Sequence, residues 1–288
     1  MSATGFPRIS VVVLSYNFER YIKECLESLA RQTLPLHEIV VCDDASQDRS
    51  FEVIQAVAQY YRGLVRPFRH PHNIGMGRNV LFGIARTSGE LLTLVDGDDR
   101  FSTRKFEAEW HAMQSTPGAQ VAYSNVRTID PEGNATGLWY DGNGPVPPSG
   151  DIFGAVFAKE IFPNNTSIFR AQLMTRAALE AVGSVDPEVD IFVDWDLKIR
   201  LAARYLVAYS GEPLVEYRIH DKGMHTWDAA RRLVSMMRVY DKCVPLLSTR
   251  PPAEAEVIRR KVQRLLLRKR NEAGSLDLTT PPAQPRRP

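Results

Sequence analysis

Apolar runs alternate with amphipathic stretches along the first 125 residues. The run Ile9–Leu14 is continuous and rich in β-branched residues, as in a parallel strand that is covered on both faces. Between Phe18 and Arg31, apolar residues recur at helical spacing. The pattern continues with predicted strands over Glu38–Cys42, Val65–Arg69, Glu90–Val95 and Ala119–Asn125, and helices over Phe51–Tyr61, Arg78–Thr87 and from Ser102 or Thr103 to Gln114. This order predicts an α/β fold with a mostly parallel sheet and right-handed crossovers.

The pattern weakens after residue 125. Gly142–Gly150 is rich in glycine and proline, and it is predicted to be a mobile loop. The remaining elements are strands at Ile168–Phe169 and Leu206–Tyr209, helices at Thr175–Val182, Asp194–Tyr205, Asp228–Leu247 and Ala253–Asn271, and a proline-rich disordered tail at Thr279–Pro288.

The charge balance argues against a nucleic-acid partner. The 288 residues contain 36 Lys and Arg against 34 Asp and Glu, a formal net charge of +2, and 44% of them are hydrophobic. Such a chain can bury a large core, and its near-neutral charge provides no general attraction to nucleic acid. Any anionic ligand must therefore be bound by local groups.

Cysteine use and hydropathy predict a cytoplasmic protein. The cysteines Cys25, Cys42 and Cys243 lack metal-site and redox-motif spacing, which suits reduced, buried thiols. We find no run of about 18 apolar residues and no signal-peptide pattern in the sequence given. In the last predicted helix an apolar stripe lies beside many basic residues, a pattern that fits peripheral contact with the inner membrane face. A helix packed on its own domain with a solvated basic face is the simpler interpretation.

Polar clusters follow three of the predicted strands, at the edge where open parallel sheets bind ligands. These clusters are Ser15–Asn17, Asp43–Asp44 and Asp96–Asp99. The last holds three carboxylates in four residues, and their mutual repulsion would be relieved by a hard divalent cation. Mg²⁺ and Mn²⁺ prefer carboxylate together with phosphate oxygens, so the loop is a predicted Mg²⁺ or Mn²⁺ site facing a diphosphate. The alternative is a simple turn, since Asp and Gly are common turn residues.

Six segments, in this order and spacing, match one family. The turn after the first strand lacks the spaced glycines of a dinucleotide or P-loop site. Instead the chain resembles family 2 glycosyltransferases of the GT-A fold, through Val11–Asn17, Val40–Asp48, Asn73–Asn79, Gly89–Asp99, Gly183–Leu201 and Tyr217–His220. The resemblance implies a Rossmann-related, mostly parallel central sheet. It also implies an enzyme that moves a sugar, with inversion, from a nucleotide diphosphate-sugar donor to a hydroxyl of a glycan or lipid-linked acceptor, in cell-surface polysaccharide or other glycan synthesis.

The same resemblance assigns donor and metal contacts to individual residues. It implies donor contacts at Ser15, Tyr16, Asn17, Asp44, Asn73, Arg78, Asp96 and Asp99, with Gly75 in the same loop as Asn73. Asp44 would accept from a base N–H, and Asp98 would be the principal metal ligand. His220 would complete the metal shell or bond a phosphate. Simpler interpretations are a turn at Asn73, a solvated helix face for Arg78 and a structural histidine.

The segment Asp194-Trp195-Asp196 opens a predicted helix. It resembles the Glu-Asp-Trp-Asp-Leu segment of the family, which implies that Asp194 is the catalytic base, although Val193 stands where the family commonly has Glu. An acceptor hydroxyl has a pKa far above neutrality, so a carboxylate that takes its proton assists the attack. Helix capping is an alternative role that is compatible with catalysis.

We therefore expect four regions along the chain. Residues 1–125 form a nucleotide-sugar-binding half and residues 126–230 an acceptor-binding half of the same globular unit, followed by C-terminal helices (231–275) and a disordered tail (276–288). Two other functions remain open: a nucleotidyltransferase, which would consume a nucleoside triphosphate, and a non-catalytic sugar-binding module.

Overall fold

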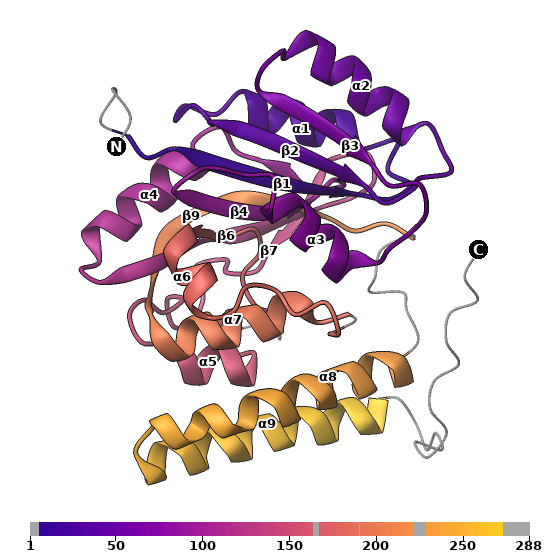
Figure 1. The fold of residues 1–288 in the computed structure, drawn as a ribbon. Coiled ribbons are helices and arrows are strands. Elements are labelled where there is room, and N and C mark those ends of the chain that lie inside the picture. Colours follow the sequence, from indigo (N-terminus) through magenta and orange to yellow (C-terminus); the bar gives the residue numbers. More distant parts are fainter. Residues whose placement is uncertain (1–5, 164–166, 190, 222–228, 273–288) are drawn as a thin grey trace.

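A curled, mostly parallel central sheet runs through the protein, and helices cover it (Figure 1). The computed structural model describes residues 6–163, 167–189, 191–221 and 229–272. Its strands are β1 (Ile9–Ser15), β2 (Glu38–Asp43), β3 (Val65–Arg69), β4 (Leu91–Asp96), β5 (Arg100–Phe101), β6 (Ala119–Ile129), β7 (Ala135–Leu138), β8 (Leu173–Thr175) and β9 (Leu206–Arg218). Its helices are α1 (Ile22–Ala30), α2 (Ser50–Tyr60), α3 (Met76–Ile84), α4 (Lys105–Ser115), α5 (Phe153–Ala158), α6 (Arg176–Ala181), α7 (Val193–Arg204), α8 (Ala229–Cys243) and α9 (Pro252–Glu272).

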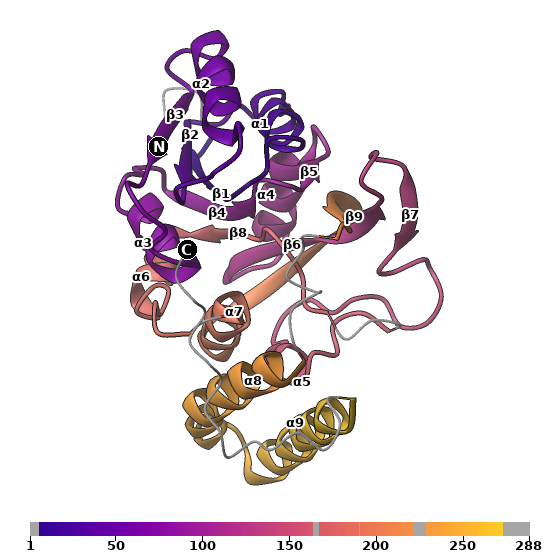
Figure 2. The ribbon, with the colours of Figure 1, turned by 90° about the vertical axis from the view of Figure 1, so that its right-hand side faces the viewer.

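The predicted order of alternating strands and helices is confirmed up to β6, with ends that differ by a few residues. Strands β1 and β2 are buried on both faces, as their continuous apolar runs predict. Figure 2 shows α3 and the pair α1 and α2 on opposite sides of these strands. Helix α3 packs very close to β1: a Cβ built on Gly83 would lie 2.4 Å from Cγ1 of Val12. The absence of a side chain at Gly83 therefore sets how near the helix can come.

Strand pairing brings the polar ends of three strands together. The sheet order is β3-β2-β1-β4-β8-β6-β9-β5, with β7 beside β6. Strand β1 pairs in parallel with β2 and β4, and its residues Leu14 and Ser15 lie opposite Asp96 and Asp43, respectively. The residues that follow β1, β2 and β4 therefore emerge at one edge of the sheet.

The second part of the sheet differs from the prediction in the length of one strand. We predicted a strand only to Tyr209, but β9 continues through Gly211 and Pro213 to Arg218. It does so because β9 pairs in parallel with β6 over its length, with register shifts that accommodate the irregular residues. Residue 125, where we expected one half to end and the next to begin, lies inside β6.

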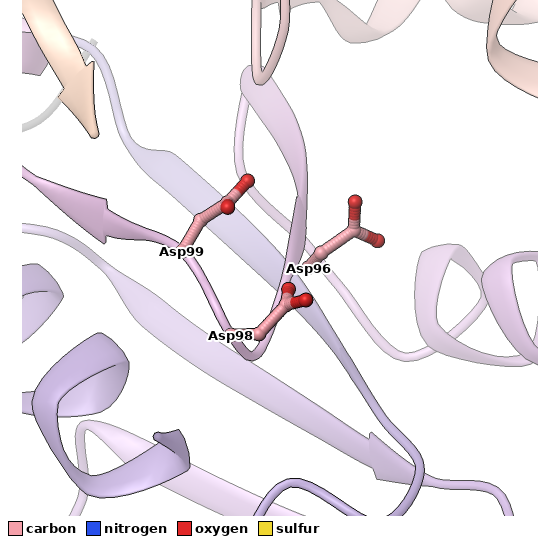
Figure 3. Close-up of side chains that lie close together, drawn as sticks. All are labelled: Asp96, Asp98 and Asp99. Carbon is pink, nitrogen blue, oxygen red and sulfur yellow. The ribbon is translucent and has the colours of Figure 1, made fainter. Parts of the chain in front are cut away.

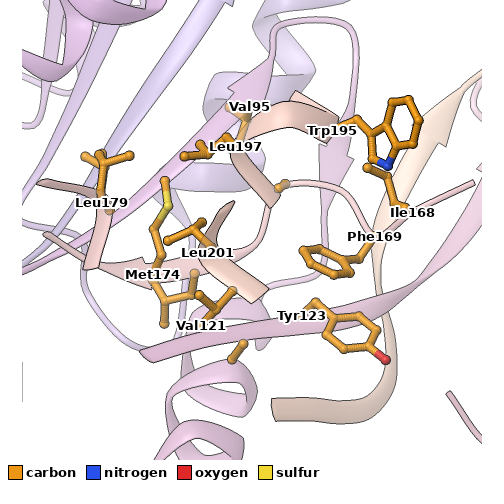
Figure 4. Packing of buried hydrophobic residues seen from close by; sticks show 14 of the residues in the cluster. Val95, Val121, Tyr123, Ile168, Phe169, Met174, Leu179, Trp195, Leu197 and Leu201 are labelled. Atoms are coloured by element: carbon orange, nitrogen blue, oxygen red, sulfur yellow. The ribbon is translucent and has the colours of Figure 1, made fainter. Parts of the chain in front are cut away.

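The strand predicted at Ile168–Phe169 is wrong, and β8 lies a few residues later. Both residues are buried in the core instead, where the ring of Phe169 stacks on Tyr123 at a centroid distance of 4.6 Å (Figure 4). Their apolar character reflects packing against other side chains and not strand pairing. Helix α5 and the short strands β5 and β7 were not predicted.

The predicted mobile loop, residues 142–150, has specific contacts with the sheet at its end. The hydroxyl of Tyr123 donates to the carbonyl oxygen of Pro148 at 2.7 Å, and Gly150 forms an isolated bridge with Val207. The mobility of this loop stays a prediction.

The C-terminal helices form an antiparallel pair beside α5 and α7 (Figures 1 and 2). We predicted one helix to Leu247, but α8 ends at Cys243 and continues as the 3-10 helix η2 (Val244–Thr249). Pro245 explains the change, because it lacks the N–H that an α-helical hydrogen bond requires. No helix among the described residues is long and apolar enough to cross a membrane. The predicted tail, residues 276–288, lies outside the described residues. Cys25, Cys42 and Cys243 are free and buried.

Candidate active site

The acidic loop turns sharply after β4 against the end of β1. The backbone N–H of Gly97 donates to the carbonyl oxygen of Leu14 at 2.8 Å. A Cβ at position 97 would lie 2.8 Å from that same oxygen and 2.6 Å from Cδ1 of Ile22. Only glycine therefore fits between the carboxylates without moving the loop.

Asp96, Asp98 and Asp99 lie close together on this loop (Figure 3). One ligand oxygen from each carboxylate lies within 4.8 Å of the others. Oδ2 of Asp98 is 2.9 Å from Nε2 of His220, whereas its Oδ1 is buried without a hydrogen-bond partner among the described residues. Three converging carboxylates with an unsatisfied oxygen are the ligand type that a hard divalent cation prefers.

Arg170 supplies the nearest positive charge to this loop. Its Nη2 lies 2.7 Å from Oδ2 of Asp96 and 3.1 Å from Oδ2 of Asp99, and its guanidinium stacks on the ring of Tyr217 at 4.1 Å. The pKa of Asp99 is raised to about 8: burial is the largest cause and the neighbouring carboxylates add to it, whereas Arg170 and the backbone N–H of Arg218 oppose it. The buried Arg218 also contacts the loop, since its Nε donates to the carbonyl oxygen of Asp98 at 3.0 Å. The two arginines face three carboxylates and neutralise the loop only in part, which is the condition that a bound cation relieves.

Asp44 fastens the loop that follows β3. Its carboxylate oxygens accept hydrogen bonds from the backbone N–H groups of Ile74 (2.8 Å) and Gly75 (3.0 Å). Burial raises the pKa of Asp44, and these two donors oppose the shift. The same loop is held by the Asn73 amide, which donates to the carbonyl oxygen of Asp44 at 3.3 Å. Asp44 thus accepts from backbone groups here; its contact with a nucleoside base stays a prediction.

A cavity of about 710 Å³ lies beside this loop. It is lined by Tyr16, Ala45, Ser46, Gln47, Arg69, His70, Pro71, His72 and Asn73. Two further predicted donor contacts support its wall: Ser15 is buried and donates to Asp43 at 3.3 Å, and Oδ1 of Asn17 accepts from the N–H of Gln47 at 2.8 Å. Arg78 lies elsewhere, since its exposed guanidinium is 3.8 Å from the carboxylate of Glu188.

A second cavity, of about 430 Å³, brings the predicted base to the acidic loop. Asp96 and Asp99 line it together with Asp194, which comes from the first turn of α7. We call this cavity the acidic cleft. Its remaining wall is mostly apolar and includes Leu14, Met76, Val80, Trp139, Ile168, Phe192, Val193 and Tyr217.

The carboxylate of Asp194 is half-exposed and forms an ion pair. Nζ of the buried Lys198, one turn later on α7, lies 2.9 Å from its Oδ2. Burial raises the pKa of Asp194, but Lys198, Lys159 and Arg170 together lower it more, so the net shift is downward. Val193 is buried and apolar, so the family's common Glu has no equivalent on this side of Asp194.

Asp196 has a different environment from Asp194. It is fully buried and pairs with Arg200 at 2.5 Å and with Lys242 of α8 at 2.8 Å. Asp196 therefore ties α7 to α8. Neither carboxylate is the N-cap of α7, which is Phe192, but both lie in the first turn, where negative charge interacts favourably with the helix dipole.

Four basic residues line the acidic cleft and were missed in the sequence: Lys159, Arg170, Lys198 and Arg232. Lys198 could have been found, since it stands four residues after Asp194 on a predicted helix, where opposite charges pair. Lys159 and Arg170 stand in segments without periodicity, and only the folded chain brings them to the acidic cleft.

The profile described as "Glycosyl transferase family 2" matches residues 10–153, half of the chain. The protein therefore belongs to glycosyltransferase family 2, and its curled sheet and flanking helices are those of the GT-A fold. An uncharacterized protein of Mycobacterium tuberculosis is 28% identical over 225 residues, covering 77% of this chain and 61% of that protein. An uncharacterized glycosyltransferase of a Nostoc species is 27% identical over 232 residues, 76% of this chain and 66% of its own length. The chain thus spans less than two thirds of these relatives.

Two solved structures have the same fold at low sequence identity. S. aureus TarS 1-349 in complex with UDP-GlcNAc gives a TM-score of 0.66 at 17% identity, covering 91% of this chain and 72% of that one. The mannosyltransferase PcManGT from Pyrobaculum calidifontis, in complex with GDP-Man and Mn²⁺, gives 0.65 at 19% identity, covering 96% and 78%.

Proposed function

We propose that the chain is a metal-dependent, inverting glycosyltransferase that moves a sugar from a nucleotide diphosphate-sugar to an acceptor hydroxyl. The observation that carries this proposal is the acidic cleft, in which Asp96 and Asp99 face the same cavity as Asp194. A diphosphate site and a proton acceptor must share one cavity for direct displacement at the anomeric carbon. Because that displacement has a single step, it inverts the sugar.

The possible metal ligands of the acidic loop fit Mg²⁺ or Mn²⁺. The unsatisfied Oδ1 of Asp98 and the close carboxylates of Asp96 and Asp99 are hard oxygen ligands. His220, whose Nδ1 is also buried without a partner among the described residues, holds Asp98 in place and is a candidate fourth ligand. When bound, the cation would neutralise charge on the departing diphosphate. The Mn²⁺ of PcManGT supports the choice of ion.

Asp194 is proposed as the general base. It faces the acidic cleft, it is ionised at neutral pH because its pKa is low, and Lys198 fixes its orientation. The acceptor hydroxyl would give its proton to Asp194 as its oxygen attacks. The apolar walls around Phe192 and Trp139 keep water from competing with the acceptor.

The cavity lined by Tyr16 and Asn73 is the proposed nucleoside site. Asn17, Ser15 and Asp44 hold its walls. The nucleotide sugars bound by TarS and PcManGT support a donor of this class. Arg78 would reach the nucleotide only after leaving Glu188.

The product is proposed to be a cell-surface polysaccharide or another glycan, built on a glycan or lipid-linked acceptor. A poly(ribitol-phosphate) beta-glucosyltransferase of Bacillus spizizenii, 28% identical over 171 residues, supports this assignment. That alignment covers 58% of this chain and 26% of the relative.

Peripheral membrane contact is proposed through the outer face of α9. Arg260 and Lys261 are exposed there, between the exposed apolar side chains of Val257 and Leu267. Basic groups interleaved with apolar ones suit an anionic lipid surface. Cosedimentation with phosphatidylglycerol vesicles, but not with phosphatidylcholine vesicles, would support the contact.

A panel of sugar nucleotides tests the proposed reaction. A cognate donor should raise the melting temperature only when Mg²⁺ or Mn²⁺ is present, and turnover should release a nucleoside diphosphate. Consumption of a nucleoside triphosphate with release of pyrophosphate would indicate a nucleotidyltransferase instead. Binding of the sugar nucleotide without hydrolysis or transfer would indicate a sugar-binding module.

A further inference from the structure

Lys159 occupies an unusual position in the acidic cleft. It follows α5 with a left-handed backbone (φ 55°), and this turn directs it to the cleft wall. Its ammonium lies over the rings of Phe192 and Trp195, at 4.8 Å and 5.2 Å from their centroids. The two rings hold a cation facing the cavity.

Within the part of the chain that the structure describes, Lys159 has no ion-pair partner of its own. Arg170 pairs with two carboxylates of the acidic loop and Lys198 pairs with Asp194. Among the described residues, no carboxylate lies within 4 Å of Nζ of Lys159, and Nζ donates no hydrogen bond. Burial lowers the pKa of Lys159 to about 8; Asp194 opposes the shift and Lys198 adds to it. An anionic group bound at this position would therefore act as a counter-ion for the Lys159 ammonium.

The position of Lys159 assigns such an anion to the acceptor. Of the charges that act on Lys159, that of Asp194 is the strongest. The diphosphate of a donor belongs instead beside Asp96, Asp98 and Asp99. A group that contacts Lys159 therefore belongs to the acceptor, whose hydroxyl gives its proton to Asp194.

We propose that Lys159 binds an anionic group, a carboxylate or a phosphate, on the acceptor, so that the enzyme selects acidic acceptors. This inference rests on the proposed transferase function. Lys159 is a specificity-determining residue: it contacts the acceptor at a distance from the reacting atoms and leaves donor binding to the acidic loop.

Binding of small acids to the full chain tests the proposal. Glucuronate represents the carboxylate, glucose 6-phosphate the phosphate, and glucose the neutral control, each titrated by NMR in the presence of the diamagnetic Mg²⁺. We expect one or both acids to bind wild type about 10- to 100-fold more tightly than glucose, as charge-assisted hydrogen bonds in a partly buried site allow. The acid that binds more tightly identifies the kind of group.

Matched variants separate the role of Lys159 from general effects. Lys159→Met keeps the apolar stem and backbone strain and should lose the preference for acids, whereas Lys159→Arg should keep it. Lys23→Met, which removes an exposed lysine on α1, should behave as wild type. Equal binding of acids and glucose by wild type, or an unchanged acid preference in Lys159→Met, overturns the proposal.

Donor binding distinguishes this inference from the proposed function. Lys159→Met should keep the metal-dependent stabilisation by the sugar nucleotide. If this stabilisation is lost in Lys159→Met but present in wild type, Lys159 binds the donor and the inference is wrong. If wild type shows no such stabilisation with any sugar nucleotide but still prefers acids, the transferase function is the part that fails.

Discussion

Nζ of Lys198 lies 2.9 Å from Oδ2 of Asp194, one helical turn away on α7. The lysine is only 3% exposed, while the carboxylate is 50% exposed and faces the acidic cleft. The protein thus buries a cation behind the proposed base, and this cation holds the pKa of Asp194 low. Lys198 acts through Asp194 as a positioning residue.

Replacing Lys198 with Met should move the pH dependence of turnover. Because Lys198 lowers the pKa of Asp194, its removal raises that pKa, and the base becomes protonated at higher pH than before. The acidic limb of the kcat profile should therefore shift upward, with the largest loss of rate below neutral pH. Lys23→Met, at an exposed lysine of α1, is the matched control. An acidic limb in the same place would show that Lys198 only supports the helix.

Replacing Asp194 with Asn should reduce turnover far more than donor affinity. A positioned general base contributes about 10²- to 10⁴-fold to rate, and the amide cannot accept the proton. Steady-state kinetics with varied donor measure both quantities. Equal losses in the two would move Asp194 from the base to a donor contact.

Replacing Asp98 with Ala should nearly abolish transfer and remove the metal dependence of donor binding. The substitution deletes the carboxylate that holds His220 and carries the unsatisfied oxygen. Metal titration monitored by melting temperature checks the result, with the exposed Glu254→Gln as control. Normal turnover in Asp98→Ala would contradict the proposed metal site.

The buried ion pair between Lys105 and Glu109 should contribute strongly to the free energy of unfolding. Lys105 and Glu109 are fully buried on α4 with Nζ and Oε2 2.6 Å apart, and Lys105 also donates to the carbonyl oxygen of Ala171. Lys105→Met should lower the free energy of unfolding by about 3–5 kcal/mol, because it leaves a buried carboxylate uncompensated. Urea unfolding measures the loss. The double variant Lys105→Met/Glu109→Leu should recover part of it, and a double variant less stable than the single one would exclude this cause.

The sequence predicted the donor side of the fold well, for a physical reason. Strands β1, β2 and β4 are buried on both faces, so most of their residues are apolar and the runs are easily seen. Parallel pairing then requires their polar ends to meet, and the register of Leu14 opposite Asp96 gives this arrangement.

The acceptor side was predicted less well, because its contacts are between segments distant in sequence. Arg170 reaches Asp96 across 74 residues, from a segment with no strand or helix of its own. Strand β9 includes Pro213, which disfavours a strand locally, and only its long partner β6 keeps it extended. Local patterns do not contain these relationships.

The three-residue strand β8 lies between β4 and β6 and pairs with both. Material from beyond residue 153, where the family match ends, therefore sits in the middle of the sheet and joins its two sides. A fragment cut at that residue would leave β4 with an open edge and would lack Arg170 and Asp194. A chimera that takes its acceptor-binding part from a relative must therefore include β8 in the exchanged segment. Without β8, the sheet of the chimera would be divided between β4 and β6.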